Sequence, residues 1–276
     1  MTLNRKIQVS LVAFALVLFV LLFLAQKKLA DKAPESSMEM KTDAPSSSIE
    51  SFLTAALKSM KLEDKADYDA VYASASGSKV DTAFVPLIQF WDKQKRPDFA
   101  SYFAEKIAER QQTAISYNKA GDRYYYSIRF TKDNTEIPSL YQSAMRCYEK
   151  ALQKDADLID AKIQLAACYV EGSTDPMKGI SLLREVEKRD SNNVKLQLSF
   201  AFFSVKSQQW DKAIKRFETV LRIDPLYIEA YLHLADTYEQ QGQTEKTIVM
   251  LEKYASLTED ATAKQEVLKY IEQLKK

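Results

Sequence analysis

The most prominent hydrophobic pattern is a largely apolar run at residues 7–25, IQVSLVAFALVLFVLLFLA, which contains no charge. As a helix with a rise of about 1.5 Å per residue, this run would just cross the hydrocarbon core of a bilayer. The competing interpretation is a cleaved signal peptide. However, such cores span only about 7 to 15 residues, and Phe23 stands where cleavage after Ala25 requires a small residue. The pattern therefore predicts a transmembrane signal-anchor helix that follows a short tail at residues 1–6.

The charges that flank this run leave its orientation open. Basic residues stand on both sides of it, so the excess of positive charge that marks the cytoplasmic side of a membrane helix is nearly absent. A short tail followed by one long apolar helix resembles a bacterial signal anchor. This resemblance implies a single-pass protein of the bacterial inner membrane, whose carboxy-terminal part lies in the periplasm rather than the cytoplasm.

Two segments of different character follow the apolar run. Residues 26–48 contain two prolines, a serine cluster and few large apolar residues, a composition typical of a flexible linker. Residues 49–80 predict a leading pair of helices. The first helix has Ser48 as its N-cap, the second covers residues 63–74, and Ser-Gly-Ser at 76–78 ends the pair. Apolar residues of the first helix recur every three or four positions, as one buried face requires: Ile49, Phe52, Leu53, Ala56, Leu57 and Met60.

A pattern of large and small residues recurs with a period near 34 residues. Shifting the chain by this period aligns residues 200–225 with residues 234–259, and large and small positions then coincide. Such spacings describe two antiparallel helices whose backbones cross closely at the small residues. In this pattern the chain resembles the tetratricopeptide repeat (TPR) family. The resemblance implies an all-α fold, a right-handed α-solenoid of helix-turn-helix repeats.

Five units can be aligned between residues 81 and 261, and a capping helix is expected in residues 262–276. The first unit departs from the pattern, because Ile88 occupies the position that is usually small. The second unit holds roughly 11 extra residues between Arg129 and Ser139. These should lengthen one helix and add a protruding loop that ends at Pro138, either as structural drift or as a partner contact. The units are 81–113, 114–158, 159–193, 194–227 and 228–261.

The composition removes most catalytic chemistry. The chain has 39 Lys and Arg against 38 Asp and Glu, so its near-zero charge argues against large-scale nucleic-acid binding. With one His and two Cys, the chain has too few of the residues that metal centres and nucleophile-His-acid sites require. The sequence also contains no glycine-rich phosphate loop. We therefore expect no enzyme, no cofactor and no metal. His233 is expected on an exposed helix face, and Cys147 and Cys168 on adjacent helices as two buried thiols or a disulfide.

The resemblance further implies a concave groove formed by the free faces of the first helices. The family's best-known peptide clamp uses Lys there, where this chain has Ile163, Leu198 and Leu232, so binding of a chaperone tail is disfavoured. An exposed apolar strip needs a cover: a helix or extended segment of a client protein, the leading helices, or a second copy of the chain in a homodimer. The candidate partner-binding residues are Tyr125, Tyr126, Ile163, Val170, Leu198, Phe202, Val205, Leu232, Asp236 and Glu239.

The sequence thus indicates a membrane-anchored, non-catalytic scaffold or adaptor that binds a protein client. Two alternatives stay open. One is a chaperone-like accessory factor in membrane protein export or cytochrome maturation, suggested by the resemblance to anchored bacterial repeat proteins. The other is an enzyme that uses surface carboxylates such as Asp236 and Glu239.

Overall fold

The computed structural model describes residues 48–131, 133–173 and 175–276. In these ranges the chain forms thirteen α-helices and one short 3-10 helix, and no strand. The predicted membrane helix at 7–25 and linker at 26–48 lie outside them, apart from Ser48. None of the helices in the described ranges combines the length and the apolar character that a membrane span needs.

The leading pair consists of α2 (Ile49–Ser59) and α3 (Leu62–Gly77). The hydroxyl of Ser48 accepts a hydrogen bond from the backbone N–H of Ser51, which caps α2 as predicted. Helix α2 packs against α5 and α7, and α3 packs against α4. Ile49 and Leu53 are the buried residues of α2, so the predicted apolar face of this helix does face the core.

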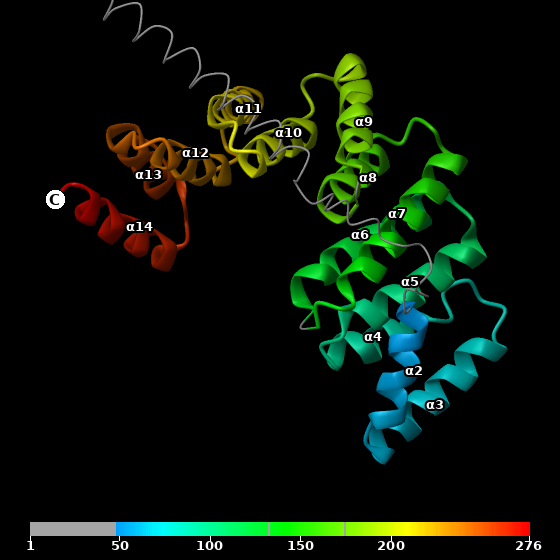
Figure 1. The fold of residues 1–276 in the computed structure, drawn as a ribbon. Helices are drawn as coiled ribbons and strands as arrows, with labels where there is room; N and C mark the ends of the chain where they lie inside the picture. The colour runs from blue at the N-terminus through cyan, green and yellow to red at the C-terminus, as the bar shows by residue number, and fades with distance from the viewer. Residues whose placement is uncertain (1–47, 132, 174) are drawn as a thin grey trace, which may run out of the picture. The chain divides into compact units, whose positions relative to one another are not determined.

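Five helix pairs follow, and each lies within the range predicted for one unit (Figure 1). A helix packs mainly against its pair partner and against the next helix in the chain. The last helix, α14 (Ala261–Leu274), packs against α13 and buries Ile271. The pairs are α4 (Val85–Lys93) with α5 (Pro97–Gln111), α6 (Ala114–Ser127) with α7 (Ile137–Lys154), α8 (Ile159–Gly172) with α9 (Pro176–Arg189), α10 (Val194–Lys206) with α11 (Trp210–Ile223), and α12 (Glu229–Gln240) with α13 (Thr244–Leu257).

The small residues lie where helices meet. Ala166 and Ala201 are fully buried, and Ala235 is 1% exposed. A Cβ atom added at Gly121 would lie 2.6 Å from the ring of Tyr148, and one added at Gly179 would lie 2.5 Å from the carbonyl oxygen of Ala166. Larger residues at these positions would force the helices apart. The alternation of large and small residues therefore acts through close helix packing.

The insertion in the second unit differs in detail from the expectation. Helix α6 ends at Ser127 and runs into the 3-10 helix Ile128–Phe130, and α7 already begins at Ile137, so Pro138 lies in the first turn of α7 and does not end a loop. Proline suits this position because the first N–H groups of a helix have no intrahelical acceptor. Just before α7, Glu136 is buried and accepts a hydrogen bond from Arg96 at 3.0 Å. The carboxy-terminal end of the insertion is therefore held against the first unit.

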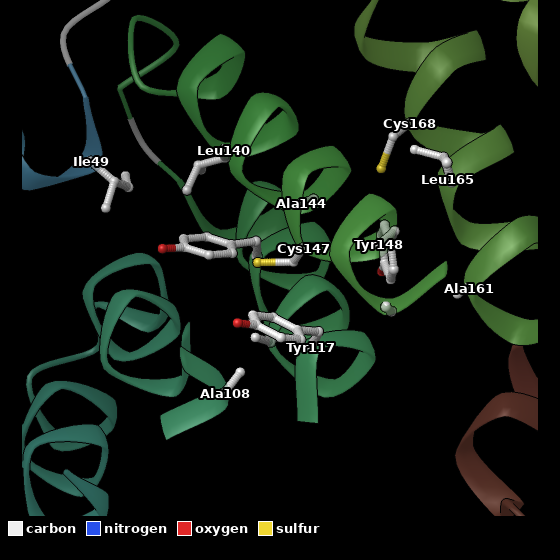
Figure 2. Close-up of a cluster of buried hydrophobic side chains, with 13 residues drawn as sticks. Ile49, Ala108, Tyr117, Leu140, Ala144, Cys147, Tyr148, Ala161, Leu165 and Cys168 are labelled. Atoms are coloured by element: carbon white, nitrogen blue, oxygen red, sulfur yellow. The ribbon is translucent and has the colours of Figure 1, made fainter. Parts of the chain in front are cut away.

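The largest buried cluster joins the second unit to its neighbours (Figure 2). Tyr117, Tyr124 and Tyr148 contribute large rings to it. Cys147 on α7 and Cys168 on α8 are both fully buried in this cluster and are free thiols, so the disulfide alternative is not realised. Burial raises the pKa of both thiols, which keeps them protonated.

Candidate protein-binding hollow

A hollow of about 570 Å3 lies between the first helices of three successive units. We call it the first-helix hollow. Its walls come from α6 and the turn after it, from α8, and from α10, and Tyr227 adds a side chain from the segment before α12. The lining residues are Tyr125, Arg129, Ile163, Gln164, Ala167, Glu171, Lys195, Leu198, Ser199, Phe202, Phe203 and Tyr227.

Four of the ten predicted binding residues meet in this hollow. They are Tyr125, Ile163, Leu198 and Phe202, which come from three different helices. Phe202 is 41% exposed, an unusual degree for a phenylalanine, whereas Ile163 is only 3% exposed and forms part of the wall. Helical spacing combined with the repeat register brought these side chains together, and whether they bind a partner stays a prediction.

The other six predicted residues lie elsewhere. Val170, Val205 and Leu232 are partly buried and pack against three different core clusters. Tyr126 is 55% exposed and packs its ring against Phe130, with 4.7 Å between the ring centroids. Two exposed carboxylates complete the set: Asp236, and Glu239, which accepts a hydrogen bond from Tyr270 of α14.

One end of the hollow is built around Glu171, which sequence reasoning missed. Its carboxylate accepts hydrogen bonds from the hydroxyl of Tyr125 at 2.8 Å and from that of Tyr141 at 3.2 Å. Burial and the charge of Glu171 raise the pKa of Tyr125, so its hydroxyl stays protonated and continues to donate. Gly172 is required beside it, because a Cβ atom there would lie 2.1 Å from the ring of Tyr141.

Charges of both signs surround the apolar centre of the hollow. Besides Glu171, the lining includes Arg129 and Lys195. The ammonium group of Lys195 pairs with Asp160 at 2.9 Å. Arg129 is exposed and forms no ion pair within the described ranges of the chain. The hollow thus offers apolar contact at its centre and both hydrogen-bond donors and acceptors at its edge, as protein-binding surfaces commonly do.

His233 is not a free surface residue, contrary to expectation. Its ring is stacked on Phe217, with centroids 5.2 Å apart and planes at 21°, and meets Phe202 edge to face at 4.8 Å. Burial lowers the pKa of His233, against the opposing effect of Asp236 and Glu229. The imidazole therefore acts as an aromatic packing group behind Phe202. The pattern of residues around His233 does not indicate this contact, because Phe217 comes from the preceding helix α11.

The leading helices do not fill the first-helix hollow. Helix α2 lies against α5 and α7, which are second helices of their units, and α3 lies against α4. None of the residues that line the hollow belongs to residues 49–77. Self-coverage by the leading helices is therefore wrong for this structure, and a client segment and a second copy of the chain remain as occupants.

The two carboxylates considered for catalysis, Asp236 and Glu239, lie outside the lining of the first-helix hollow. No group of three or more His, Cys, Asp or Glu side chains is arranged there to hold a metal ion. Of the two carboxylates considered for an enzyme, Asp236 is exposed and Glu239 is engaged by Tyr270.

Comparison with known protein families finds one match in this chain. The TPR repeat family matches residues 205–242, and no curated protein matches the chain. Among solved structures, the chain is similar to YrrB, described as a TPR protein with an unusual peptide-binding site, with 20% identity over 71% of this chain and 96% of that one and a TM-score of 0.43. It is also similar to MamA, with 17% identity over 69% and 94% of the two chains and a TM-score of 0.45. A third similar structure is MamA 41-end from Desulfovibrio magneticus RS-1, with 14% identity over 67% and 99% and a TM-score of 0.47.

The family match covers two helices of the structure. Residues 205–242 contain α11, the second helix of the fourth unit, and α12, the first helix of the fifth. Buried small residues stand in both, Ala213 in α11 and Ala235 in α12, as the repeat pattern requires. In the described ranges the chain is therefore all-α, and its residues 205–242 match the TPR repeat family.

Proposed function

We propose that the protein is a membrane-anchored, non-catalytic scaffold that binds a helix or extended segment of a client protein in the first-helix hollow. The observation that carries the proposal is the exposed ring of Phe202 among Ile163, Ala167 and Leu198. An aromatic anchor that is surrounded by apolar side chains and edged by charges is typical of the centre of an interface. TPR repeats commonly serve as protein-protein interaction scaffolds, which agrees with this role.

Blocking the hollow tests the proposal better than placing a charge on Phe202. The Phe202 ring contacts Phe217 and His233, so Phe202→Asp would also weaken the packing between α10, α11 and α12. Ser199 lines the hollow, and its hydroxyl donates a hydrogen bond to the carbonyl of Lys195 in its own helix. Ser199→Trp would fill the space with an indole ring and leave the core intact.

The matched control is Ser256→Trp on α13. Ser256 is exposed and bonds in the same way to a carbonyl of its own helix, that of Lys253. After crosslinking in cells and purification from membranes, proteins captured by the parent and by Ser256→Trp should be lost from Ser199→Trp. The proposal is wrong if all three chains fold and capture the same proteins. If Ser199→Trp captures the same proteins as the parent but differs from it in oligomeric state, the occupant of the hollow is a second copy of the chain.

The membrane part of the proposal rests on the apolar run at residues 7–25. A helix of this length is held in lipid far more firmly than a near-neutral domain could adhere to a surface. The full chain should therefore resist carbonate extraction, and a chain that starts near Ser46 should be soluble. Extraction of the full chain would contradict the anchor. Digestion of the repeats by protease added to spheroplasts would support the periplasmic orientation, and protection would reverse it.

A further inference from the structure

A second hollow, of about 510 Å3, lies between α9, α10 and α11. We call it the basic hollow. Whereas the first-helix hollow is formed by first helices, this one lies between one first helix and the second helices on either side of it. Phe203 is the only residue that lines both. The lining residues of the basic hollow are Met177, Ile180, Arg184, Glu187, Phe200, Phe203, Ser204, Ser207, Gln209, Lys212, Lys215 and Arg216.

The charges of Arg216 and Glu187 in this hollow neutralise each other. Arg216 donates to Glu187 at 2.6 Å and to the side-chain oxygen of Gln197 at 2.9 Å. Its guanidinium group also lies 4.3 Å from the centroid of the Phe200 ring. Glu187 is the only carboxylate in the lining, so this pairing leaves no negative charge for the remaining cations.

Three cations are left without a carboxylate partner. Arg184, Lys212 and Lys215 are exposed, and none of them forms an ion pair with any residue in the described ranges of the chain. Lys212 donates to the neutral side chain of Gln209. In a chain whose formal charge is only +1, this concentration of positive charge in one hollow is a local feature. It would attract a negatively charged group at short range.

The surface between these cations is apolar. Phe200 and Ile180 are partly buried, and Met177 is 62% exposed. The hydroxyls of Ser204 and Ser207 bond to carbonyls of their own helix, so they add little polarity. A flexible Met side chain can adapt to apolar groups of different shapes. An occupant that fits this hollow therefore combines carboxylates with at least one apolar side chain.

We propose that the basic hollow is a second docking site, which binds a short acidic peptide segment of a partner protein. Carboxylates of the segment pair with Arg184, Lys212 and Lys215, and an apolar side chain rests on Met177, Ile180 and Phe200. A nucleic-acid backbone fits less well, because it has no apolar side chain and the whole chain is nearly neutral. Together with the first-helix hollow, this site would allow the scaffold to hold two partners at once.

The test uses displayed random peptides of about 12 residues, a length suited to a groove of this size. They are selected on the full chain in a neutral detergent. The charge-reversed variant is Arg184→Glu with Lys215→Glu. The control, Lys188→Glu with Arg222→Glu, changes the net charge equally on the same two helices, at exposed residues outside the hollow. Arg184→Gln with Lys215→Gln serves if the reversed variant does not fold.

The proposal predicts recovered peptides that are rich in Asp and Glu around an apolar residue. Recovery should fall about tenfold or more on the charge-reversed variant and stay unchanged on the control. Peptides without acidic enrichment, or equal recovery on all chains, would overturn the proposal. The proposal would also be overturned if a single-stranded DNA oligonucleotide or phosphatidylglycerol vesicles displaced the bound peptides at a lower concentration than a free acidic peptide does. The first-helix hollow is unchanged in these variants, so failure here is separate from failure of the proposed function.

Discussion

The substitution Gly179→Ala offers a quantitative test of the close packing between α8 and α9. A Cβ atom at this position would lie 2.5 Å from the carbonyl oxygen of Ala166 and 2.9 Å from a methyl carbon of Val170. An ordinary contact begins near 3.4 Å, so the two helices must separate by about 0.9 Å unless a neighbour yields. The Ala166 carbonyl belongs to the backbone of α8 and has little freedom to move.

Two opposing effects determine how much Gly179→Ala changes the free energy of unfolding. Overpacking of a close helix contact costs about 1 to 3 kcal/mol. Alanine in place of glycine inside a helix returns up to about 1 kcal/mol. Gly77 serves as the reference without overpacking, because it is the last residue of helix α3 and a Cβ atom there meets nothing within 4 Å. We expect Gly77→Ala to be neutral or slightly stabilising, and Gly179→Ala to be less stable than it by about 1 to 3 kcal/mol.

Urea unfolding followed by circular dichroism measures the difference, and hydrogen exchange locates it. In a repeat array each unit contacts only its neighbours, so loosening should concentrate in α8 and α9 and leave α12 and α13 protected. The reasoning is refuted if Gly179→Ala is as stable as Gly77→Ala. It is also refuted if faster exchange appears in α12 and α13 but not in α8 and α9.

Three further predictions concern side chains that the fold buries fully or in part. Ala201→Leu and Ala235→Leu should each lower the free energy of unfolding by about 1 to 3 kcal/mol, because both alanines are buried at helix contacts, and unchanged melting would contradict the repeat register. Burial lowers the pKa of His233 below 6.5, so the unfolded chain binds the proton more readily than the folded chain. The free energy of unfolding should therefore fall as the pH drops below 6.5. The variant His233→Gln should lose that part of the pH dependence, which urea unfolding at a series of pH values measures. Cys147 and Cys168 should resist a thiol reagent until the chain unfolds, and rapid labelling of the native protein would be the contrary result.

The helices were readable from the sequence because local spacing determines them. Ser48, the stripe that begins at Ile49, and the recurring small residues each act within one helix or between consecutive helices. The same spacing brought Tyr125, Leu198 and Phe202 into one hollow, since residues of equivalent register on successive first helices face the same side. Periodicity therefore indicates which face of a helix a residue occupies.

What the sequence did not show depends on contacts between residues that are distant in the chain. Glu171 becomes part of the hollow through Tyr125 and Tyr141, which lie 46 and 30 positions away. His233 is partly covered by Phe217 of another helix, and no motif marks that stacking. A helical face that looks exposed in isolation can thus be covered by a neighbour.

The basic hollow was missed for a related reason. Its cations stand on α9 and α11, where each looks like an ordinary exposed residue of an amphipathic helix. The stacking of consecutive units brings Arg184 into the same hollow as Lys212 and Lys215. The same stacking pairs Glu187 with Arg216, so Glu187 does not neutralise these three cations. Net charge alone gave no sign of this, because positive and negative residues balance over the whole chain.

The most direct test of the central claim is site-specific photocrosslinking from inside the first-helix hollow. A photoreactive phenylalanine derivative replaces Gln164, which lines the hollow, or Gln265, which is exposed on α14. Irradiation of living cells should join a client protein to the chain from position 164 and not from position 265, and Ser199→Trp should abolish that crosslink. Equal crosslinks from both positions, or a crosslink from position 164 that persists with Ser199→Trp, would contradict the account.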